Sequence, residues 1–149
     1  MSVFRNILVA FDFGRASERA LEVAIDLARP AGARLTILHV CEVPAYAYVG
    51  VDVAPADLLT PIAEAGEARL RDLVRSEQAR FPGAQGAFRV GVPADEILAQ
   101  VAEGAHDLVV MGTHGRRGLA HLAIGSVAER IVRTSPVPVL TVRGEPGER

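Results

Sequence analysis

The fold of this chain is decided by the stretch DLVVMG, residues Asp107–Gly112, which a glycine-rich segment follows. A short apolar run without polar alternation is typical of a strand that is buried on both faces of a parallel sheet. A similar run, NILVAFD, stands near the start of the chain at Asn6–Asp12. The two runs therefore predict buried parallel strands, one early and one late in the chain.

Predicted strands and helices alternate along the whole chain. Strands are predicted at Asn6–Asp12, Arg34–Val43, Ala87–Val92, Asp107–Gly112 and Val137–Arg143. Helices, where apolar residues recur at helical spacing, are predicted at Arg15–Ala31, Pro61–Arg80, Ala94–Glu103 and Gly125–Thr134, the second with Ile62, Leu70, Leu73 and Val74 facing inward. Residues 44–60 show no clear period, so we predict a long loop that covers a site at the strand ends. The pattern predicts one α/β domain over residues 1–149: a five-stranded, parallel, doubly wound, Rossmann-like sheet with helices on both faces.

Composition narrows the class of protein. The formal net charge is −2, which argues against a nucleic-acid partner, and no apolar stretch approaches the ~20 residues that span a membrane. All 16 basic residues are arginine, so a Walker A lysine and a Schiff-base lysine are both excluded. The single cysteine, Cys41, has apolar neighbours and predicts a buried thiol in a reducing compartment, so we expect a cytoplasmic protein.

The segment after Gly112 carries the strongest chemical signal. Gly112, Gly115 and Gly125 border or interrupt it, and Ser126 starts the next predicted helix. Glycines let backbone N–H groups approach a phosphate without interference from a Cβ atom. The unpaired N–H groups and the dipole of the helix would point at the same place. The segment therefore predicts a phosphate site that needs no lysine.

The spacing Gly, two residues, Gly, nine residues, Gly, Ser resembles the ATP-binding signature of the universal stress protein family. Similar features extend along the chain, with Asp12 at the end of the first strand and a Pro-Val-rich last strand at Ser135–Leu140. Ser17–Leu21 resembles the first helix of that family and Leu38–Val40 its second strand. The resemblance implies a fold similar to the adenine nucleotide alpha hydrolases, and ATP with Mg²⁺ held through its phosphates.

The resemblance also implies roles for single residues. Asp12 and the backbone of Val40 would recognise adenine. Gly112 and Gly115 would hold ribose and phosphates, while Ser126 and Val127 would close on the phosphates. The full set of implied contacts is Ala10, Phe11, Asp12, Val40, Met111, Gly112, His114, Gly115, Arg116, Gly125, Ser126 and Val127. The chain departs from some nucleotide-binding relatives at Ala128, where they carry a hydroxyl.

Other interpretations of these residues stay open. Ser126 and Glu129 match a capping box, so Ser126 would cap the helix with or without a phosphate role. Asp12 would instead cap the helix that follows it. Arg116, with its neighbour Arg117, is either a phosphate clamp or a solvated loop arginine. His114 would reach a phosphate or lie exposed in the loop.

The remaining histidines and the assembly complete the expectations. We expect His39 to pack near a strand end and His106 and His121 to face solvent, with no zinc site. Pro138 suits an edge strand, so we expect a homodimer through Val137–Arg143.

Three functions remain open on sequence alone. The leading one is an ATP-binding stress-response regulator, for which no catalytic residue is predicted. A slow ATPase or nucleotidyl transferase is the second, since Asp12 and His114 lie near the expected phosphates without a visible orienting group. The third is a nucleotide-independent interaction module. A dinucleotide dehydrogenase is excluded, because Asp12–Ala16 lacks the Gly-x-Gly-x-x-Gly pattern. A phosphoreceiver domain is excluded by the missing lysine.

Overall fold

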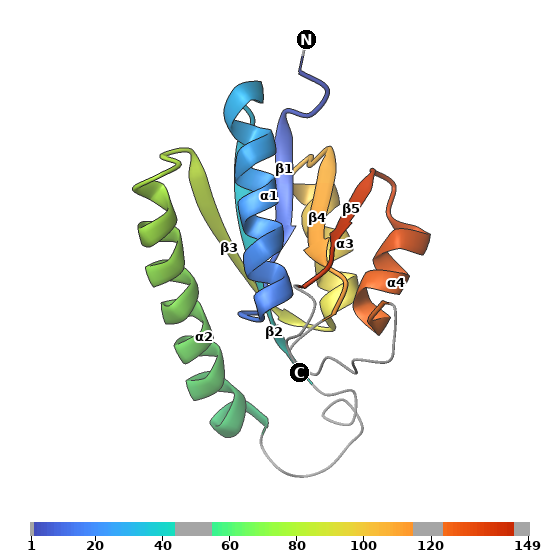
Figure 1. The fold of residues 1–149 in the computed structure, drawn as a ribbon. Coiled ribbons are helices and arrows are strands. Elements are labelled where there is room, and N and C mark those ends of the chain that lie inside the picture. Colours follow the sequence, from blue (N-terminus) through green and yellow to red (C-terminus); the bar gives the residue numbers. More distant parts are fainter. Residues whose placement is uncertain (1, 44–54, 115–123, 145–149) are drawn as a thin grey trace.

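The computed structural model describes residues 2–43, 55–114 and 124–144. Along the chain the elements are β1 (Asn6–Ala10), α1 (Arg15–Ala31), β2 (Arg34–Glu42), α2 (Pro55–Gln78), β3 (Ala84–Gly91), α3 (Pro93–Glu103), β4 (Leu108–Gly112), α4 (Ser126–Thr134) and β5 (Val139–Val142). The five strands form one parallel sheet in the order β3-β2-β1-β4-β5 (Figure 1). The predicted α/β fold is confirmed.

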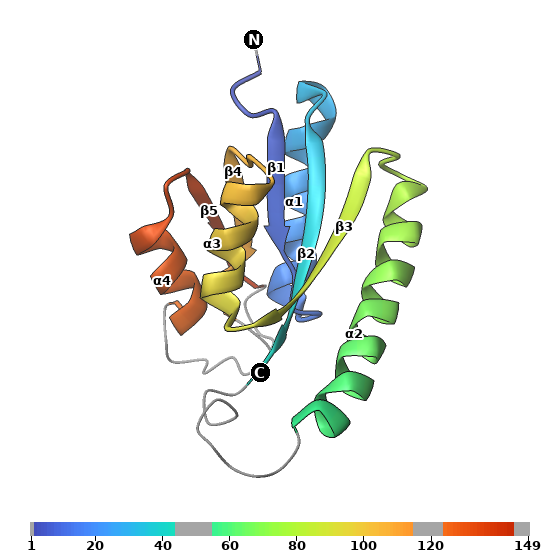
Figure 2. The ribbon, with the colours of Figure 1, turned by 180° about the vertical axis from the view of Figure 1, so that it is seen from behind.

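Helices cover both faces of the sheet. Figure 1 shows α1 and α2 in front of it, and Figure 2, from behind, shows α3 and α4 on the opposite face. The central strand β1 feeds both cores: Ile7 and Val9 pack with α1, whereas Leu8 packs with α3 and α4. All three side chains are fully buried. Burial on both faces explains why β1 is apolar without alternation.

The second helix starts earlier than expected. Residues 55–60, which we predicted as part of a loop, belong to α2, and Pro61 lies inside the helix. A proline at the first helical position is favourable, because its φ is already helical and no N–H is lost there. The inward face is also only partly as predicted, since Leu70 is buried but Ile62 is 59% exposed. The loop proposed to cover a site is therefore shorter, and its residues 44–54 lie outside the described part.

The strands also differ from their predicted ranges. β3 begins at Ala84, where its pairing with Leu35 of β2 starts, three residues before the predicted start. β5 is shorter than Val137–Arg143, and Pro138 precedes it, although the Pro138 carbonyl accepts a hydrogen bond from Val109 N–H. The other ends shift by one or two residues, as frayed ends usually do.

The strand order determines where a ligand can bind. From β1 the chain winds outward to β2 and β3, then crosses to β4 and β5 on the other side. β1 and β4 are neighbours, with Ala10 opposite Met111. In an open parallel sheet, the crevice for ligands lies beyond the carboxyl ends of the strands where the winding reverses. That point follows Ala10 and Gly112.

Candidate functional site

The predicted contact residues from three strands meet at this switch point. Ala10 and Met111 are cross-strand neighbours. Phe11 continues from β1 and donates its N–H to the Leu38 carbonyl, 2.8 Å away, which brings it beside β2 two residues before Val40. The fold therefore gathers segments that are about a hundred positions apart in the sequence.

Asp12 is held in a tight turn between β1 and α1. Its Oδ1 accepts a hydrogen bond from Gly14 N–H at 2.8 Å and lies 2.8 Å from the Ser17 hydroxyl oxygen. The N-cap of α1 is Gly14, so the interpretation of Asp12 as a helix cap is wrong, and the carboxylate braces the turn instead. Among the described residues, no hydrogen bond reaches the second oxygen, Oδ2. Asp12 therefore has one oxygen bound internally and one oxygen available for a ligand.

Glycine is needed at position 112 for a packing reason that the sequence did not reveal. A Cβ atom at this position would lie 2.7 Å from Ala16 Cβ and 2.9 Å from the Ala16 carbonyl carbon. The end of β4 and the start of α1 are thus in direct backbone contact. Glycine is required here for helix–strand packing, and the same contact brings the residues after β4 close to the turn at Asp12.

The two ends of the glycine-rich segment are tied together. Gly125 N–H donates to the Thr113 carbonyl at 2.5 Å, and Thr113 N–H donates to the Val142 carbonyl at 2.9 Å. This places the beginning of α4 directly beyond the end of β4. Gly115 and Arg116, which the sequence assigned to the same site, lie outside the described residues, as does His121.

The capping box predicted at Ser126 does not form. Gly125 is the N-cap of α4 and supplies no side-chain hydrogen bond, while Ser126 is the first helical residue and is exposed. The Glu129 carboxylate pairs with Arg133 instead of returning to the helix start. Among the described residues no side chain caps this end of α4, so its first N–H groups suit an anion.

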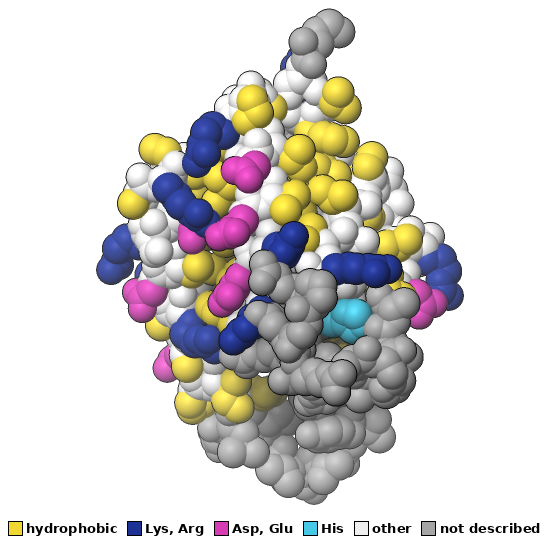
Figure 3. Space-filling model, in the orientation of Figure 1, with side chains coloured by type: hydrophobic (Ala, Val, Ile, Leu, Met, Phe, Trp, Pro, Cys, Tyr) yellow, Lys and Arg dark blue, Asp and Glu magenta, His cyan; other side chains and the backbone are white. Residues whose placement is uncertain are grey.

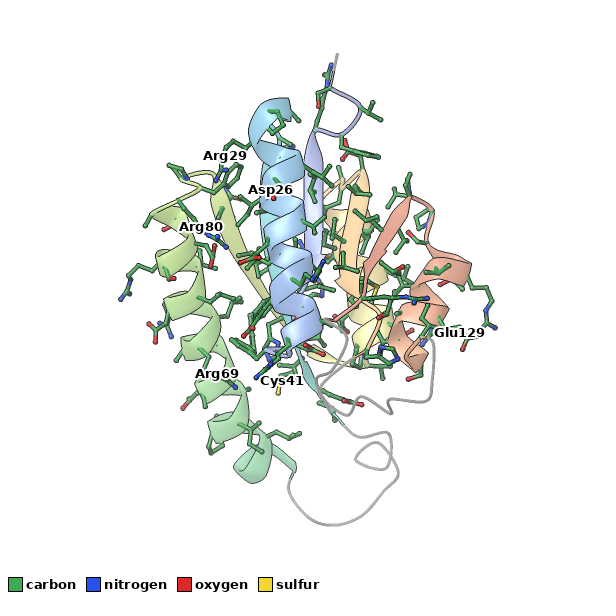
Figure 4. The ribbon with its side chains drawn as sticks, viewed as in Figure 1. Asp26, Arg29, Cys41, Arg69, Arg80 and Glu129 are labelled. Atoms are coloured by element: carbon green, nitrogen blue, oxygen red, sulfur yellow. The ribbon has the colours of Figure 1, made fainter. Side chains whose placement is uncertain are left out.

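An aromatic cluster borders the same crevice and was missed at the level of sequence. The Phe13 ring packs edge-on against Phe11 (centroids 5.1 Å apart) and against His39 (4.8 Å). The Arg69 guanidinium carbon lies 4.0 Å from the centre of the Phe13 ring. Figure 4 shows Arg69 reaching from α2 toward the base of α1. No local pattern signals this cluster, because its members come from three parts of the chain: the loop after β1, strand β2 and helix α2.

Two histidines bear on the predictions. His39 packs near the strand end as expected, with its Nδ1 2.8 Å from the Phe11 carbonyl oxygen. His106 was expected in solvent, but it is 5% exposed, and neither ring nitrogen has a hydrogen-bond partner in the described structure. It follows α3 and folds back over Gly104, where a Cβ would lie 2.4 Å from His106 Nε2. Burial lowers the pKa of His106 below its ordinary value.

The charged side chains on this face of the molecule are arginines and single aspartates or glutamates (Figure 3). Figure 3 shows basic side chains, all arginine because the chain has no lysine, and one histidine at the level where the strands end. Within the described ranges, no three His, Cys, Asp or Glu side chains lie close enough to hold a metal ion. None of the helices in the described residues is long and apolar enough to cross a membrane.

Comparison with known proteins gives one consistent result. A family model described as the universal stress protein family matches residues 4–143. A relative from Bacillus subtilis, universal stress protein YxiE, is 34% identical over 148 residues, which cover 95% of this chain and all of the relative.

Solved structures agree with the sequence matches. Universal stress protein UspA from Lactobacillus plantarum superposes with a TM-score of 0.81 at 25% identity, covering 94% of this chain and 98% of that one. A universal stress protein family protein from Arabidopsis thaliana, solved with AMP bound, has a TM-score of 0.63 at 20% identity, covering 95% and 93% of the two chains. The second likeness concerns the fold alone.

Proposed function

This chain belongs to the universal stress protein family, and from that premise we propose that it is a regulator of a stress response that binds ATP. The observation that carries the proposal is the Gly125–Thr113 hydrogen bond, which seats the start of α4 beyond the end of β4. An α-helix start without a side-chain cap is a favourable site for a phosphate group.

The phosphates of ATP fit this helix start for a second reason. The chain has no lysine, so backbone N–H groups and the Ser126 hydroxyl would donate hydrogen bonds to a triphosphate, and arginine would supply positive charge. Each contact between an anion and a helix start contributes roughly 0.3–1 kcal/mol, and several act together. Since the described residues include no metal-binding cluster, Mg²⁺ would be held through the phosphate oxygens rather than by protein carboxylates.

The base would lie on the other side of the switch point. Asp12 Oδ2 is an acceptor oxygen beside the end of β1, and an exocyclic amino group is the donor that it would recognise. The backbone of Val40 on β2 supplies the second contact that the family resemblance implies. The AMP in the Arabidopsis structure supports an adenine nucleotide as the ligand class on this fold.

Calorimetry with purified protein tests this proposal. We expect ATP with Mg²⁺ to bind, and ITP, which carries a carbonyl in place of the amino group, to bind at least about tenfold more weakly. Asp12→Asn, which turns an acceptor oxygen into a donor, should reduce that preference, and Gly115→Val should abolish binding. Asp72→Asn, an exposed carboxylate on α2, is the matched control.

Two results would overturn the proposal. One is the absence of both co-purified adenine nucleotide and ATP binding at concentrations up to about 1 mM. The other is steady release of ADP at a rate that matters, because the site would then belong to an ATPase.

We also propose that the protein is a homodimer joined through β5. This strand lies at one edge of the sheet and pairs only with β4 among the described strands, so its outer backbone groups can pair with another chain. Leu140 is 37% exposed on it, and Figure 3 shows hydrophobic side chains beside α1 over this part of the sheet. Sedimentation should give a dimer that Leu140→Asp converts to monomer; a wild-type monomer at micromolar concentration would disprove the dimer.

We place this regulator in the cytoplasm. The support is its single cysteine, which suits a reducing compartment because it has no partner within the chain for a disulfide. Cell fractionation with an antibody against the protein tests this placement.

A further inference from the structure

Phe13 has a backbone conformation that large side chains rarely adopt. Its φ is +64°, and Ala105 is the only other described non-glycine residue with a positive φ. Such a conformation persists only where the surroundings impose it, and it occurs preferentially at ligand sites. A glycine at position 13 would adopt this φ without strain, but the chain has phenylalanine there and glycine at position 14.

The ring of Phe13 explains how this conformation is held. It is enclosed by Phe11 from the preceding residues, His39 from β2 and Arg69 from α2, at the distances given above. The His39 ring is itself anchored on the Phe11 carbonyl oxygen and stacks toward Phe88 of β3, with ring centres 6.0 Å apart. Three separate elements therefore fix the position of one side chain.

Phe13 lies within the turn that the Asp12 carboxylate closes. The hydrogen bond from Gly14 N–H to Asp12 Oδ1 closes a turn, and Phe13 is the residue inside that turn. In the observed turn Phe13 has φ +64°, and this backbone geometry presents Gly14 N–H to Asp12 Oδ1. The Ser17 hydroxyl completes the bracing of Oδ1 from the first turn of α1.

We infer that Phe13 is a positioning residue for the nucleotide site, which holds Asp12 so that Oδ1 stays bound within the turn and Oδ2 faces a ligand. This inference rests on the proposed function. It assigns the aromatic cluster and Arg69 a role that a packing contact alone would not have: they set the preference for a base with an amino group. Phe13 acts through Asp12 and does not itself recognise the base.

Three substitutions of Phe13 separate its backbone role from its ring. Phe13→Val has a β-branched side chain that disfavours positive φ, and we expect it to weaken ATP binding about tenfold or more and to remove the preference over ITP. Phe13→Tyr keeps both the ring and the conformation and should retain both properties. Phe13→Gly keeps access to positive φ without the ring contacts, so its affinity should lie between the two.

A double-mutant cycle with Asp12→Asn tests whether Phe13 acts through Asp12. In the Asp12→Asn protein, Phe13→Val should cause little further loss of ATP affinity, because the group that it positions is already altered. Additive losses, or a Phe13→Val protein that folds and keeps the wild-type preference for ATP over ITP, would overturn the inference.

Arg69 provides a variant outside the turn. Arg69→Met keeps a long apolar side chain over the ring but removes the cation, and it should reduce the ATP preference part of the way, whereas Arg71→Met on the exposed surface of α2 should leave it unchanged. Equal effects of the two variants would count against the role of the cluster.

A measurement without nucleotide keeps this inference distinct from the proposed function. Hydrogen exchange of the Gly14 amide should be faster in Phe13→Val than in the wild-type protein, because its bond to Asp12 is weakened. Unchanged exchange disproves the positioning role whether or not ATP binds. If the exchange changes but the wild-type protein binds no adenine nucleotide, the ligand assignment fails while the turn geometry stands.

Discussion

Gly112 and Ala16 lie so close together that a Cβ atom on Gly112 would be 2.7 Å from Ala16 Cβ. This contact joins the end of β4 to the first turn of α1, the two elements that flank the switch point. The position of the candidate site therefore depends on the packing of Gly112 against Ala16, whether or not Gly112 also contacts a ligand.

Gly112→Ala should therefore destabilise the protein even without nucleotide. Overpacking of this kind costs about 2 kcal/mol, which corresponds to a fall of about 4–8 °C in Tm for a domain of this size. Gly144→Ala is the matched control, because a Cβ there would lie 3.9 Å from the same Ala16 side chain and should have little effect. Ala16→Gly should restore part of the stability lost in Gly112→Ala; failure of both expectations would mean that the contact is not limiting.

His106 should make stability depend on pH. Burial, and secondarily the positive charge of Arg34, lower its pKa from the ordinary value of 6.5, against the opposite effects of the Asn6 backbone and Asp107. The unfolded chain therefore takes up a proton on His106 at a higher pH than the folded protein does. Its contribution to stability is complete above pH 6.5 and is lost as the pH falls below that value through the folded pKa.

Urea unfolding at pH 7.5 and at pH 5.5 measures this effect. The loss of stability between the two values should be smaller in His106→Phe, which keeps a ring but cannot take up a proton. The same loss in the variant and in the wild-type protein would show that other groups carry the pH dependence.

Arg89 should contribute more to stability than an exposed arginine does. It lies on β3 with its side chain 23% exposed, and its Nε donates to Glu96 at 2.6 Å while Nη1 donates to Glu103 at 2.8 Å. These bonds to the two carboxylates raise the pKa of Arg89, so it stays charged at every accessible pH. Arg89→Met should cost about 1–2 kcal/mol, since two carboxylates lose their partner.

Chemical denaturation compares the two partners of Arg89. Glu96→Gln, at a site 26% exposed, should lower the free energy of unfolding more than Glu103→Gln, at a site 65% exposed. The reverse order would mean that burial does not set the strength of these pairs.

Cys41 should react slowly in the folded protein. The side chain is buried, and burial raises the pKa of its thiol, so little of the reactive thiolate forms. Ellman's reagent at pH 8 should label native protein roughly tenfold or more slowly than urea-unfolded protein. Equal rates would show that the C-terminal end of β2 opens readily, and Cys41→Ser gives the blank.

The sequence was sufficient to predict the α/β class and the family. Apolar runs such as Leu108–Gly112 identify strands that are buried on both faces, and their alternation with amphipathic segments predicts the parallel sheet. Element ends were less predictable, since proline at position 61 suggested a helix start that the structure places at Pro55. Proline is favourable at the start of a helix and unfavourable in its interior, so Pro61 alone suggested a start there, although the helix continues through it.

Details of the candidate site were predicted unevenly. Asp12 lies in the turn after β1 and Gly125 precedes α4, both beyond the strand ends at the switch point, whereas their role toward a ligand stays a prediction. The capping box at Ser126 was wrong, because the helix begins one residue after Gly125 and the Glu129 carboxylate pairs with Arg133. Which of two possible partners a side chain binds depends on three-dimensional geometry that the sequence does not contain.

The sequence by itself determined which segments form strands and helices, because burial and periodicity are properties of neighbouring residues. Only the tertiary structure decided that Gly112 is needed against Ala16, that the His106 ring is buried with no hydrogen-bond partner among the described residues, and that Phe13 is held at positive φ. Each of these three depends on contacts between residues from different elements. Such contacts exist only after the sheet has assembled, so no local pattern in the chain records them.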